Sequence, residues 1–356
     1  MAAKHVKPKL SESQVSEMMK RLFNLTPSVI RSLPSYDDQN FYVASIEGGE
    51  YVLKIMNSED SKNLTIIEVQ THAMSFLHQH GLPAQTAVPT SSGELMSLEE
   101  MDCGYGRQKY LVRLLTYLPG VTISKVPLTP KLLYETGKTA ARMDEILCKM
   151  EHPHLSILER ENFLWSLSNV VLLEAYINIL DGDPLQPVVK SVIHHYKTSV
   201  APQRSNFRKC INHGDFNDLN VLVQPDNNDG YKISGILDFG DMNSGYYIYE
   251  LAIAIMYMMT EHPEPIEVGG PILAGWESVH PLNEAEKDCL YFLVLSRFCQ
   301  SLVIARYSVT MHPENAEYLM ISSKSGVRIL RNLWELGKEH VEKVWFQSAA
   351  LLGDKM

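Results

Sequence analysis

Apolar residues recur at two different spacings, and the spacing changes about a third of the way along the chain. Before this change, apolar and polar positions alternate in short runs, which is typical of β-strands. The runs cover residues 29–33, 40–46, 51–56, 86–89, 94–98 and 109–116. Helical spacing is confined there to 11–24, where Ser11 and Gln14 suit a capping box, and to 61–80, which ends at Gly81. The pattern predicts a small region that is rich in strands.

Beyond Leu118-Pro119-Gly120 the apolar spacing becomes helical over long stretches. These stretches cover residues 130–150, 169–180, 187–200, 246–260, 284–309 and 316–348. Two strand-like runs, 221–223 and 231–237, interrupt the helices. The change predicts an α+β protein of two lobes, a small β-rich N-lobe (residues 1–116) and a larger, mainly helical C-lobe (residues 117–356).

Charge and cysteine content narrow the classes of function. The chain has 356 residues and a net charge of −10, and an acidic surface repels nucleic acid and anionic lipid. Its five cysteines are scattered without a Cys-x-x-Cys pair, so we expect neither a disulfide framework nor a zinc site. No apolar run approaches the length of a membrane span. We therefore expect a cytoplasmic protein with no nucleic-acid or membrane partner.

The strongest chemical signal is the segment His213-Gly214-Asp215-Phe216-Asn217-Asp218-Leu219-Asn220. An Asp followed five positions later by an Asn has the spacing of a kinase catalytic loop. In such a loop Asp215 accepts the proton of the substrate hydroxyl, and Asn220 reaches a magnesium ion on the phosphates. Taken alone, Asp215 is equally well explained as a turn residue, because Gly and Asp both favour turns.

A second carboxylate ends an apolar strand, in Leu237-Asp238-Phe239-Gly240. We expect the runs 221–223 and 231–237 to form a hairpin, which brings Asn220 and Asp238 to one end. Carboxylate oxygen is a preferred ligand of Mg²⁺. The sequence therefore predicts Asn220 and Asp238 as magnesium ligands.

A third signal is Lys54, which follows Tyr51-Val52-Leu53 on a predicted strand. Such a lysine can reach nucleotide phosphates, and Glu68 in the following helix is a candidate partner for it. Each residue has an ordinary explanation by itself, Lys54 as a solvated edge residue and Glu68 as a surface charge. The order Lys, Glu, His-x-Asp-x₄-Asn, Asp-Phe-Gly within one chain is what favours phosphoryl transfer.

Features of protein kinases that serve a peptide substrate are missing. Gly214 replaces the usual Arg, and no Ala-Pro-Glu follows Gly240. The turn 34–40 stands in place of a Gly-rich loop, and Ser35 with its backbone N–H groups is a candidate cover for the phosphates. A small-molecule kinase is favoured, while an atypical protein kinase and a non-catalytic nucleotide-binding scaffold stay open.

The motifs around Asp215, Asn220 and Asp238 resemble the aminoglycoside phosphotransferase and choline kinase superfamily over nearly the whole chain. Longer phrases, 33–41, 110–120 and 235–242, resemble its hydroxylysine kinase family. The resemblance implies a protein-kinase-like fold, Mg²⁺, and transfer from GTP to 5-hydroxy-L-lysine, a step of lysine breakdown. It also implies a purine-binding hinge at Thr116, Tyr117 and Leu118. The alternative is an ATP-dependent kinase of choline, homoserine, a fructosamine or an aminoglycoside-like amine.

A substrate like hydroxylysine carries two amines and a carboxylate, which need partners of opposite charge. The candidates for the amines are Asp218, Asp241 and Glu250, and the candidate for the carboxylate is Arg297. Tyr246 and Tyr247 are candidates for lining the pocket. Glu250 and Arg297 are also explained as a helix salt bridge and a helix-end contact. The sequence does not predict an oligomeric state.

Overall fold

The structure is a computed structural model that describes residues 7–35, 37–104, 106–227, 230–313, 316–320 and 323–353. Tyr36, in a phrase that carries the family resemblance, lies outside these residues. The chain divides into two compact units: unit 1 is Met1–Leu118 with His152–His154, and unit 2 is Pro119–Glu151 with Leu155–Met356. The boundary that we expected after Thr116 falls two residues before this division.

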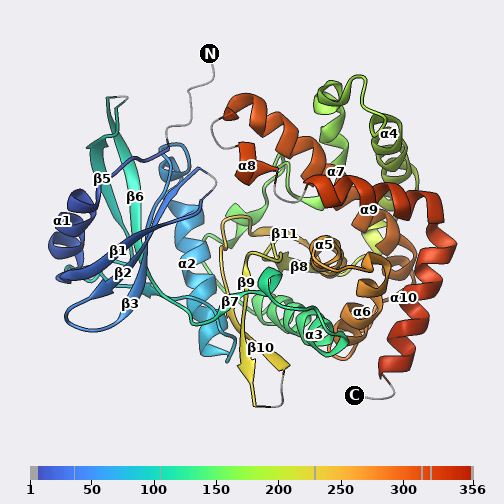
Figure 1. Ribbon diagram of the computed structural model, residues 1–356, viewed down its shortest axis with the longest axis horizontal. Helices are drawn as coiled ribbons and strands as arrows, with labels where there is room; N and C mark the ends of the chain where they lie inside the picture. The colour runs from blue at the N-terminus through green and yellow to red at the C-terminus, as the bar shows by residue number, and fades with distance from the viewer. Residues whose placement is uncertain are drawn as a thin grey trace. The chain divides into compact units, whose positions relative to one another are not determined.

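Unit 1 contains an antiparallel sheet in the strand order β1-β2-β3-β6-β4, with β5 also paired to β6 (Figure 1). Its strands are β1 (Pro27–Leu33), β2 (Gln39–Ser45), β3 (Glu50–Ile55), β4 (Ala87–Val88), β5 (Ser97–Asp102) and β6 (Arg107–Thr116). Lys54, on β3, lies opposite Asn40 of β2 and Arg113 of β6. The predicted strand of Lys54 is therefore an interior strand of the sheet.

Two helices accompany this sheet, α1 (Glu12–Phe23) and α2 (Leu64–Gln79), with a short 3₁₀ turn, η1 (Asp60–Lys62), before α2. The predicted capping box at Ser11 and Gln14 is present. The apolar face of α1 joins the core of the sheet, and this core includes Val15, Met18, Met19, Phe41, Leu53 and Tyr110.

Unit 2 carries two small antiparallel sheets, in the strand orders β10-β9-β7 and β11-β8. Their strands are β7 (Val121–Thr122), β8 (Lys209–Asn212), β9 (Val221–Asp226), β10 (Gly230–Ile236) and β11 (Asn243–Tyr246). The predicted hairpin is confirmed, because Val221 of β9 lies opposite Ile236 of β10. The sequence did not predict β7, β8 and β11, since two to four residues are too few to show an alternation.

Helices form most of the rest of unit 2 (Figure 1). They are α3 (Pro130–Leu147), α4 (Gln186–His195), α5 (Tyr247–Thr260), α6 (Gly269–Glu277), α7 (Glu284–Met311), α8 (Ala316–Leu319), α9 (Ser323–Leu336) and α10 (Lys338–Gly353). A π turn, η5 (Tyr196–Val200), continues α4. The 3₁₀ segments are η2 (Ile123–Lys125), η3 (Leu155–Leu158), η4 (Leu167–Leu180), η6 (Ala201–Asn206) and η7 (Pro265–Val268).

Two helical predictions need correction, and one helix was not predicted. The single helix expected over 316–348 is divided among α8, α9 and α10, and Gly337, with φ at +78°, separates α9 from α10. The helix expected over 169–180 is a 3₁₀ segment. Helix α6 was not predicted, because its Gly-Gly-Pro start weakens the helical signal.

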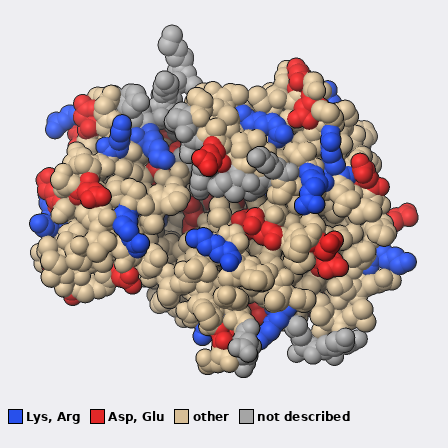
Figure 2. Space-filling model, viewed as in Figure 1, with Lys and Arg blue, Asp and Glu red and all other residues tan. Residues whose placement is uncertain are grey.

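Helix α7 is the core helix of unit 2. It is the one helix among the described residues that is long and apolar enough to span a membrane, but 83% of its most apolar window is buried. On the visible face of the molecule, basic and acidic side chains are interspersed (Figure 2). Helices α5 and α7 matter for function because they carry Glu250 and Arg297, both fully buried, toward the loop after β8.

Candidate active site

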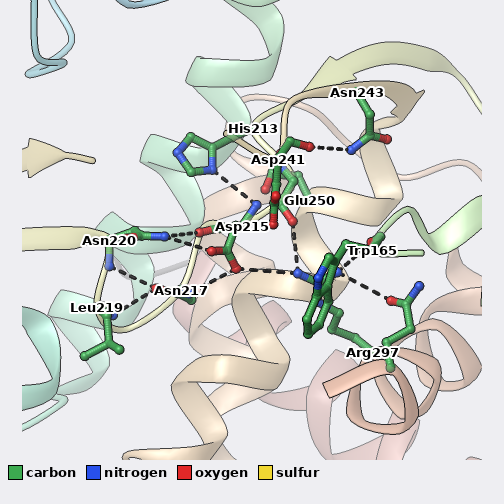
Figure 3. Close-up of polar contacts among 12 residues, drawn as sticks. Trp165, His213, Asp215, Asn217, Leu219, Asn220, Asp241, Asn243, Glu250 and Arg297 are labelled. Carbon is green, nitrogen blue, oxygen red and sulfur yellow. Dashed lines mark hydrogen bonds and ion pairs between the residues drawn. The ribbon is translucent and has the colours of Figure 1, made fainter. Parts of the chain in front are cut away.

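The loop between β8 and β9 is closed by its own side chains (Figure 3). Oδ1 of Asn217 accepts the backbone N–H groups of Leu219 and Asn220, both at 2.9 Å. Nδ2 of Asn217 and Nδ2 of Asn220 each donate to the Asp215 carboxylate at 3.0 Å. Asp215 and Asn220, five positions apart in the sequence, are therefore in direct contact.

His213 joins this loop to the end of β10. Its Nε2 lies 2.9 Å from the carbonyl oxygen of Leu237, and its Nδ1 accepts the N–H of Asp215 at 3.2 Å. Its ring packs edge-on against Phe239, with centroids 4.7 Å apart. Burial lowers the pKa of His213 to about 4, so the imidazole is neutral near pH 7. His213 therefore holds the segment of Asp238 against the segment of Asp215.

Gly214 occupies a position that no other residue fits. Its φ is +83°, and a Cβ there would lie 2.5 Å from the carbonyl oxygen of Asp241. Its N–H donates to Glu250 at 3.2 Å, and its carbonyl oxygen accepts from Arg297 at 3.0 Å. An Arg at this position, as in protein kinases, would be excluded by this packing.

The Asp215 carboxylate lies between opposing charges. Burial and the negative charge of Asp241 raise its pKa well above the ordinary value, while Arg297 lowers it. The Arg297 guanidinium approaches Oδ1 of Asp215 at 3.5 Å. A quarter of the Asp215 side chain remains exposed, so a substrate hydroxyl can reach it.

Asp238 and Asn220 meet at one end of the β9–β10 hairpin. The N–H of Leu237 donates to the carbonyl oxygen of Asn220 at 2.8 Å. Asp238 has a φ of +55°, a left-handed conformation that Asp tolerates better than most residues, and its Oδ1 accepts the N–H of Gly240 at 3.1 Å. Arg160 then holds the following turn by donating to the carbonyl oxygen of Gly240 at 3.1 Å.

The donor atoms at this end of the hairpin fit a magnesium ion. Nδ2 of Asn220 is directed at Asp215, which leaves the amide oxygen of Asn220 as the atom that can bind a metal. Amide and carboxylate oxygens, from Asn220 and Asp238, are the ligands that Mg²⁺ takes in proteins. We keep both residues as candidate metal ligands.

Glu250 contacts the backbone of the catalytic loop. It is fully buried behind the loop, where Oε2 accepts the N–H of Gly214. Burial raises the pKa of Glu250 to about 7, and burial together with Glu250 raises that of Asp144 well above its ordinary value. One oxygen of each carboxyl is buried without a hydrogen-bond partner among the described residues. A proton shared by this pair would satisfy both oxygens, which makes Glu250 a support of the loop.

Arg297 also makes hydrogen bonds within the protein. It is fully buried and donates to the carbonyl oxygens of Trp165, at 2.7 Å, and Gly214, at 3.0 Å (Figure 3). Its guanidinium lies 4.9 Å from the ring centroid of Trp165 and 5.5 Å from that of Tyr257. These two hydrogen bonds go to the protein backbone, and the role of Arg297 as the partner of a substrate carboxylate stays a prediction.

The two tyrosines expected in the pocket point elsewhere. Tyr247 stacks on His280 with ring centroids 3.8 Å apart. Tyr246 packs edge-on against Phe207, at 5.6 Å, and against Tyr249, at 5.1 Å. Both residues lie at the β11–α5 junction, and their role in lining a substrate pocket stays a prediction.

Asp218 and Asp241 remain as acidic groups near Asp215. Asp218 is only 3% exposed, and burial together with the charge of Glu261 raises its pKa to about 7. Asp241 is half-buried, and its charge acts on both Asp215 and Arg297. Sequence reasoning missed Glu261 and Tyr257, which belong to the α5 region and carry no motif.

Unit 1 places a different carboxylate beside Lys54 from the one expected. Nζ of Lys54 lies 3.0 Å from Oδ2 of Asp38, whereas Glu68 is on the exposed face of α2. Oγ of Ser35 donates to the carbonyl oxygen of Asp38, within the turn that precedes β2. The expected pairing of Lys54 with Glu68 is therefore corrected to Asp38, a residue that lies in the turn and not in a helix.

The candidate hinge follows directly from the end of β6. The carbonyl oxygen of Thr116 accepts from Gln85 at 3.0 Å, and the N–H of Tyr117 donates to the carbonyl oxygen of Glu50 at 3.1 Å. Tyr117 packs edge-on against Tyr42 at 4.9 Å. These contacts hold the backbone at Thr116 and Tyr117, and Leu118 is the last residue of unit 1 before the division.

Residues 29–285 match the model of the phosphotransferase enzyme family, so the chain belongs to that family. The match includes Lys54, the Asp215 loop and Asp238. The protein is accordingly an enzyme that transfers a phosphoryl group to an alcohol acceptor.

Curated relatives extend the match to almost the full chain. The hydroxylysine kinase of Danio rerio is 63% identical over 98% of both chains. The hydroxylysine kinases of Xenopus laevis and Bos taurus are 50% and 48% identical over 96% of this chain and 95% and 94% of theirs. Among solved structures, an amicoumacin kinase superposes with a TM-score of 0.68 at 16% identity, covering 94% of both chains, which shows the kinase-like fold.

Proposed function

We propose that this enzyme transfers the γ-phosphoryl group of GTP to the hydroxyl of 5-hydroxy-L-lysine, giving 5-phosphohydroxy-L-lysine and GDP. The observation that carries the proposal is the 63% identity with a hydroxylysine kinase over 98% of the chain, together with the Asp215 loop. The reaction fits a step of lysine breakdown, as the family resemblance implies. Five free cysteines suit the cytoplasmic location that we also propose.

Asp215 is proposed as the catalytic base. The substrate hydroxyl oxygen bonds to the γ-phosphorus, the bond from that phosphorus to the bridging oxygen breaks, and the hydroxyl proton passes to Asp215. The amides of Asn217 and Asn220 orient the carboxylate, and Arg297 favours its ionised form. Such positioning is the main contribution that a protein makes to phosphoryl transfer.

Asn220 and Asp238 are proposed to hold Mg²⁺, which would neutralise charge on the transferring phosphates. Lys54 is proposed as the phosphate-binding cation, and the turn with Ser35 as the cover of the phosphates. The segment of Thr116, Tyr117 and Leu118 is proposed to receive the purine.

Acidic side chains around Asp215 suit a substrate that carries two amines. Asp218 is the stronger candidate for binding an ammonium group, because its burial makes an unpaired charge costly and a cationic partner favourable. Asp241 is the second candidate, through its proximity to Asp215. Glu250, Arg297, Tyr246 and Tyr247 are left out of this proposal, since their contacts lie within the protein.

A coupled assay with Mg²⁺ tests the proposal. Purified enzyme is given GTP or ATP with 5-hydroxylysine, choline, homoserine, an aminoglycoside or a fructosamine-lysine. We expect turnover of 5-hydroxylysine, with a higher kcat/KM for GTP than for ATP. Turnover of choline or homoserine without turnover of 5-hydroxylysine would overturn the substrate assignment, and a preference for ATP would overturn the donor assignment.

A further inference from the structure

The carboxylate beside Lys54 belongs to the turn before β2. Nζ of Lys54 lies 3.0 Å from Oδ2 of Asp38, and the two side chains are only 14% and 11% exposed. An ion pair that is this well shielded from water is held more firmly than a surface pair. Asp38 therefore restricts the position of the Lys54 ammonium group.

Asp38 is itself held in place by the backbone that follows β3. Its Oδ1 accepts the N–H of Asn57 at 2.8 Å and Nδ2 of Asn57 at 3.3 Å. Nδ2 of Asn57 also donates to Asp60 at 2.7 Å. The two oxygens of Asp38 thus make separate contacts, since Oδ1 accepts hydrogen bonds from Asn57 and Oδ2 pairs with Lys54.

The face of α2 that packs inward presents no carboxylate to β3. Arg113, opposite Lys54 on β6, donates to Oγ1 of Thr71 on α2 at 2.8 Å. Thr71 is buried whereas Glu68, three residues earlier, is exposed. The neighbouring strand is therefore joined to α2 by a neutral hydroxyl, whereas the Lys54 ammonium group pairs with a carboxylate of the turn.

The carboxylates around Asp38 favour a cation at this point. One oxygen from each of Asp37, Asp38 and Asp60 lies within 4.8 Å of the others. Their mutual repulsion is relieved by a nearby positive charge, and Lys54 provides it. An ammonium group has three N–H donors, so a contact with Asp38 is compatible with contacts to phosphate oxygens.

We propose that Asp38 is the positioning residue of Lys54, and that it orients the lysine toward nucleotide phosphates in the role that sequence reasoning gave to Glu68. The inference rests on the proposed role of Lys54 in nucleotide binding. Because Asp38 lies in the same turn as Ser35, the turn proposed to cover the phosphates and the lysine proposed to bind them are one structural unit.

The test is a binding cycle that does not depend on the acceptor. Affinities for GTP and ATP with Mg²⁺ are measured by titration calorimetry for the wild type, Asp38→Asn, Asp38→Glu, Glu68→Gln, Lys54→Met and Asp38→Asn combined with Lys54→Met. Glu100→Gln serves as the matched control, since Glu100 is an exposed carboxylate on β5 of the same unit. Urea unfolding of each variant checks that the fold is retained.

We expect Asp38→Asn to weaken nucleotide binding roughly 10- to 100-fold, the usual size of effect when a residue that orients a functional side chain is removed. Asp38→Glu should recover part of this affinity, and Glu68→Gln and Glu100→Gln should stay within about twofold of the wild type. In the Lys54→Met background, Asp38→Asn should add less than about twofold.

Three results would overturn the inference. The first is a loss of nucleotide affinity in Glu68→Gln as large as in Asp38→Asn, and the second is tighter nucleotide binding by Asp38→Asn than by the wild type. The third is that Asp38→Asn lowers the affinity as much in the Lys54→Met background as in the wild type. Wild-type affinity in Lys54→Met would instead overturn the proposed role of Lys54. Failure to phosphorylate 5-hydroxylysine would overturn only the substrate assignment, because the binding cycle needs no acceptor.

Discussion

At the scale of single residues, the site depends on the groups that hold Asp215. Two amides donate to its carboxylate, and a buried guanidinium lies 3.5 Å away. Gly214 and His213, the two residues before it, have no part in the chemistry and yet admit little change. Gly214 has a backbone angle that only glycine adopts readily, and His213 is a neutral imidazole in the core.

Gly214→Ala is expected to damage both stability and activity. A Cβ would meet the carbonyl oxygen of Asp241 at 2.5 Å, in a backbone conformation with φ at +83°. We expect a loss of about 2–4 kcal/mol in the free energy of unfolding, from strain and displaced backbone together. Urea unfolding measures it, with Gly182→Ala as control, since Gly182 also has a positive φ, +78°, but nothing within 4 Å. Equal losses in both variants would show that packing at Gly214 is unimportant.

His213 should make stability depend on pH in the acid range. Its folded pKa of about 4 lies below the unfolded value of about 6.5, so the unfolded chain binds the proton more tightly. The contribution is therefore complete above pH 6.5 and is lost as the pH falls to 4, by about 3 kcal/mol in total. Comparing urea unfolding of the wild type and His213→Gln across this range measures the loss. Parallel curves for the two proteins would contradict the prediction.

At the scale of elements, α5 and α7 support the catalytic loop through the backbone of Gly214. Glu250 of α5 accepts the N–H of Gly214, and Arg297 of α7 donates to its carbonyl oxygen. Because both the N–H and the carbonyl oxygen of Gly214 are hydrogen-bonded, this backbone segment has little freedom to move. The two helices therefore determine the direction in which Asp215 points.

Arg297→Met should lower kcat more than it changes nucleotide affinity. The variant keeps the volume of the side chain but leaves the carbonyl oxygens of Gly214 and Trp165 without their donor. We expect a loss of about 3–5 kcal/mol in stability, as when one partner of a buried ion pair is removed. Kinetics at saturating nucleotide and urea unfolding measure the two effects. Lys287→Met, on the partly exposed start of α7, is the control. A loss of stability and of kcat in Lys287→Met as large as in Arg297→Met would contradict the role of Arg297 in supporting the loop.

The elements that repeat a clear pattern were predictable, and the residues proposed for catalysis lie at the ends of such elements. The β9–β10 hairpin was predicted, and it places Asn220 beside the residue before Asp238. The partners of these residues were not predictable, because helix α7 gives the same apolar pattern whichever way Arg297 points. Glu68 failed for a similar reason, since spacing along α2 does not say which face packs on the sheet.

At the scale of the whole molecule, the family match and the two-unit division agree with a bilobal kinase-like fold. Most of the described catalytic contacts lie within unit 2, whereas Lys54 and the candidate hinge belong to unit 1. Binding of nucleotide and chemistry at the acceptor are therefore expected to respond to different substitutions. Asp38→Asn tests the binding of nucleotide, and a substitution of Asp215 tests the chemistry at the acceptor.

The most direct measurement is the rate at which Asp215→Asn phosphorylates 5-hydroxylysine at saturating Mg²⁺ and GTP. We expect kcat to fall about 10²- to 10⁴-fold, because the hydroxyl proton loses its acceptor. The dissociation constant for GTP should stay within about twofold of the wild type, since Asp215 serves the acceptor. Full activity in Asp215→Asn would contradict the assignment of Asp215 as the base.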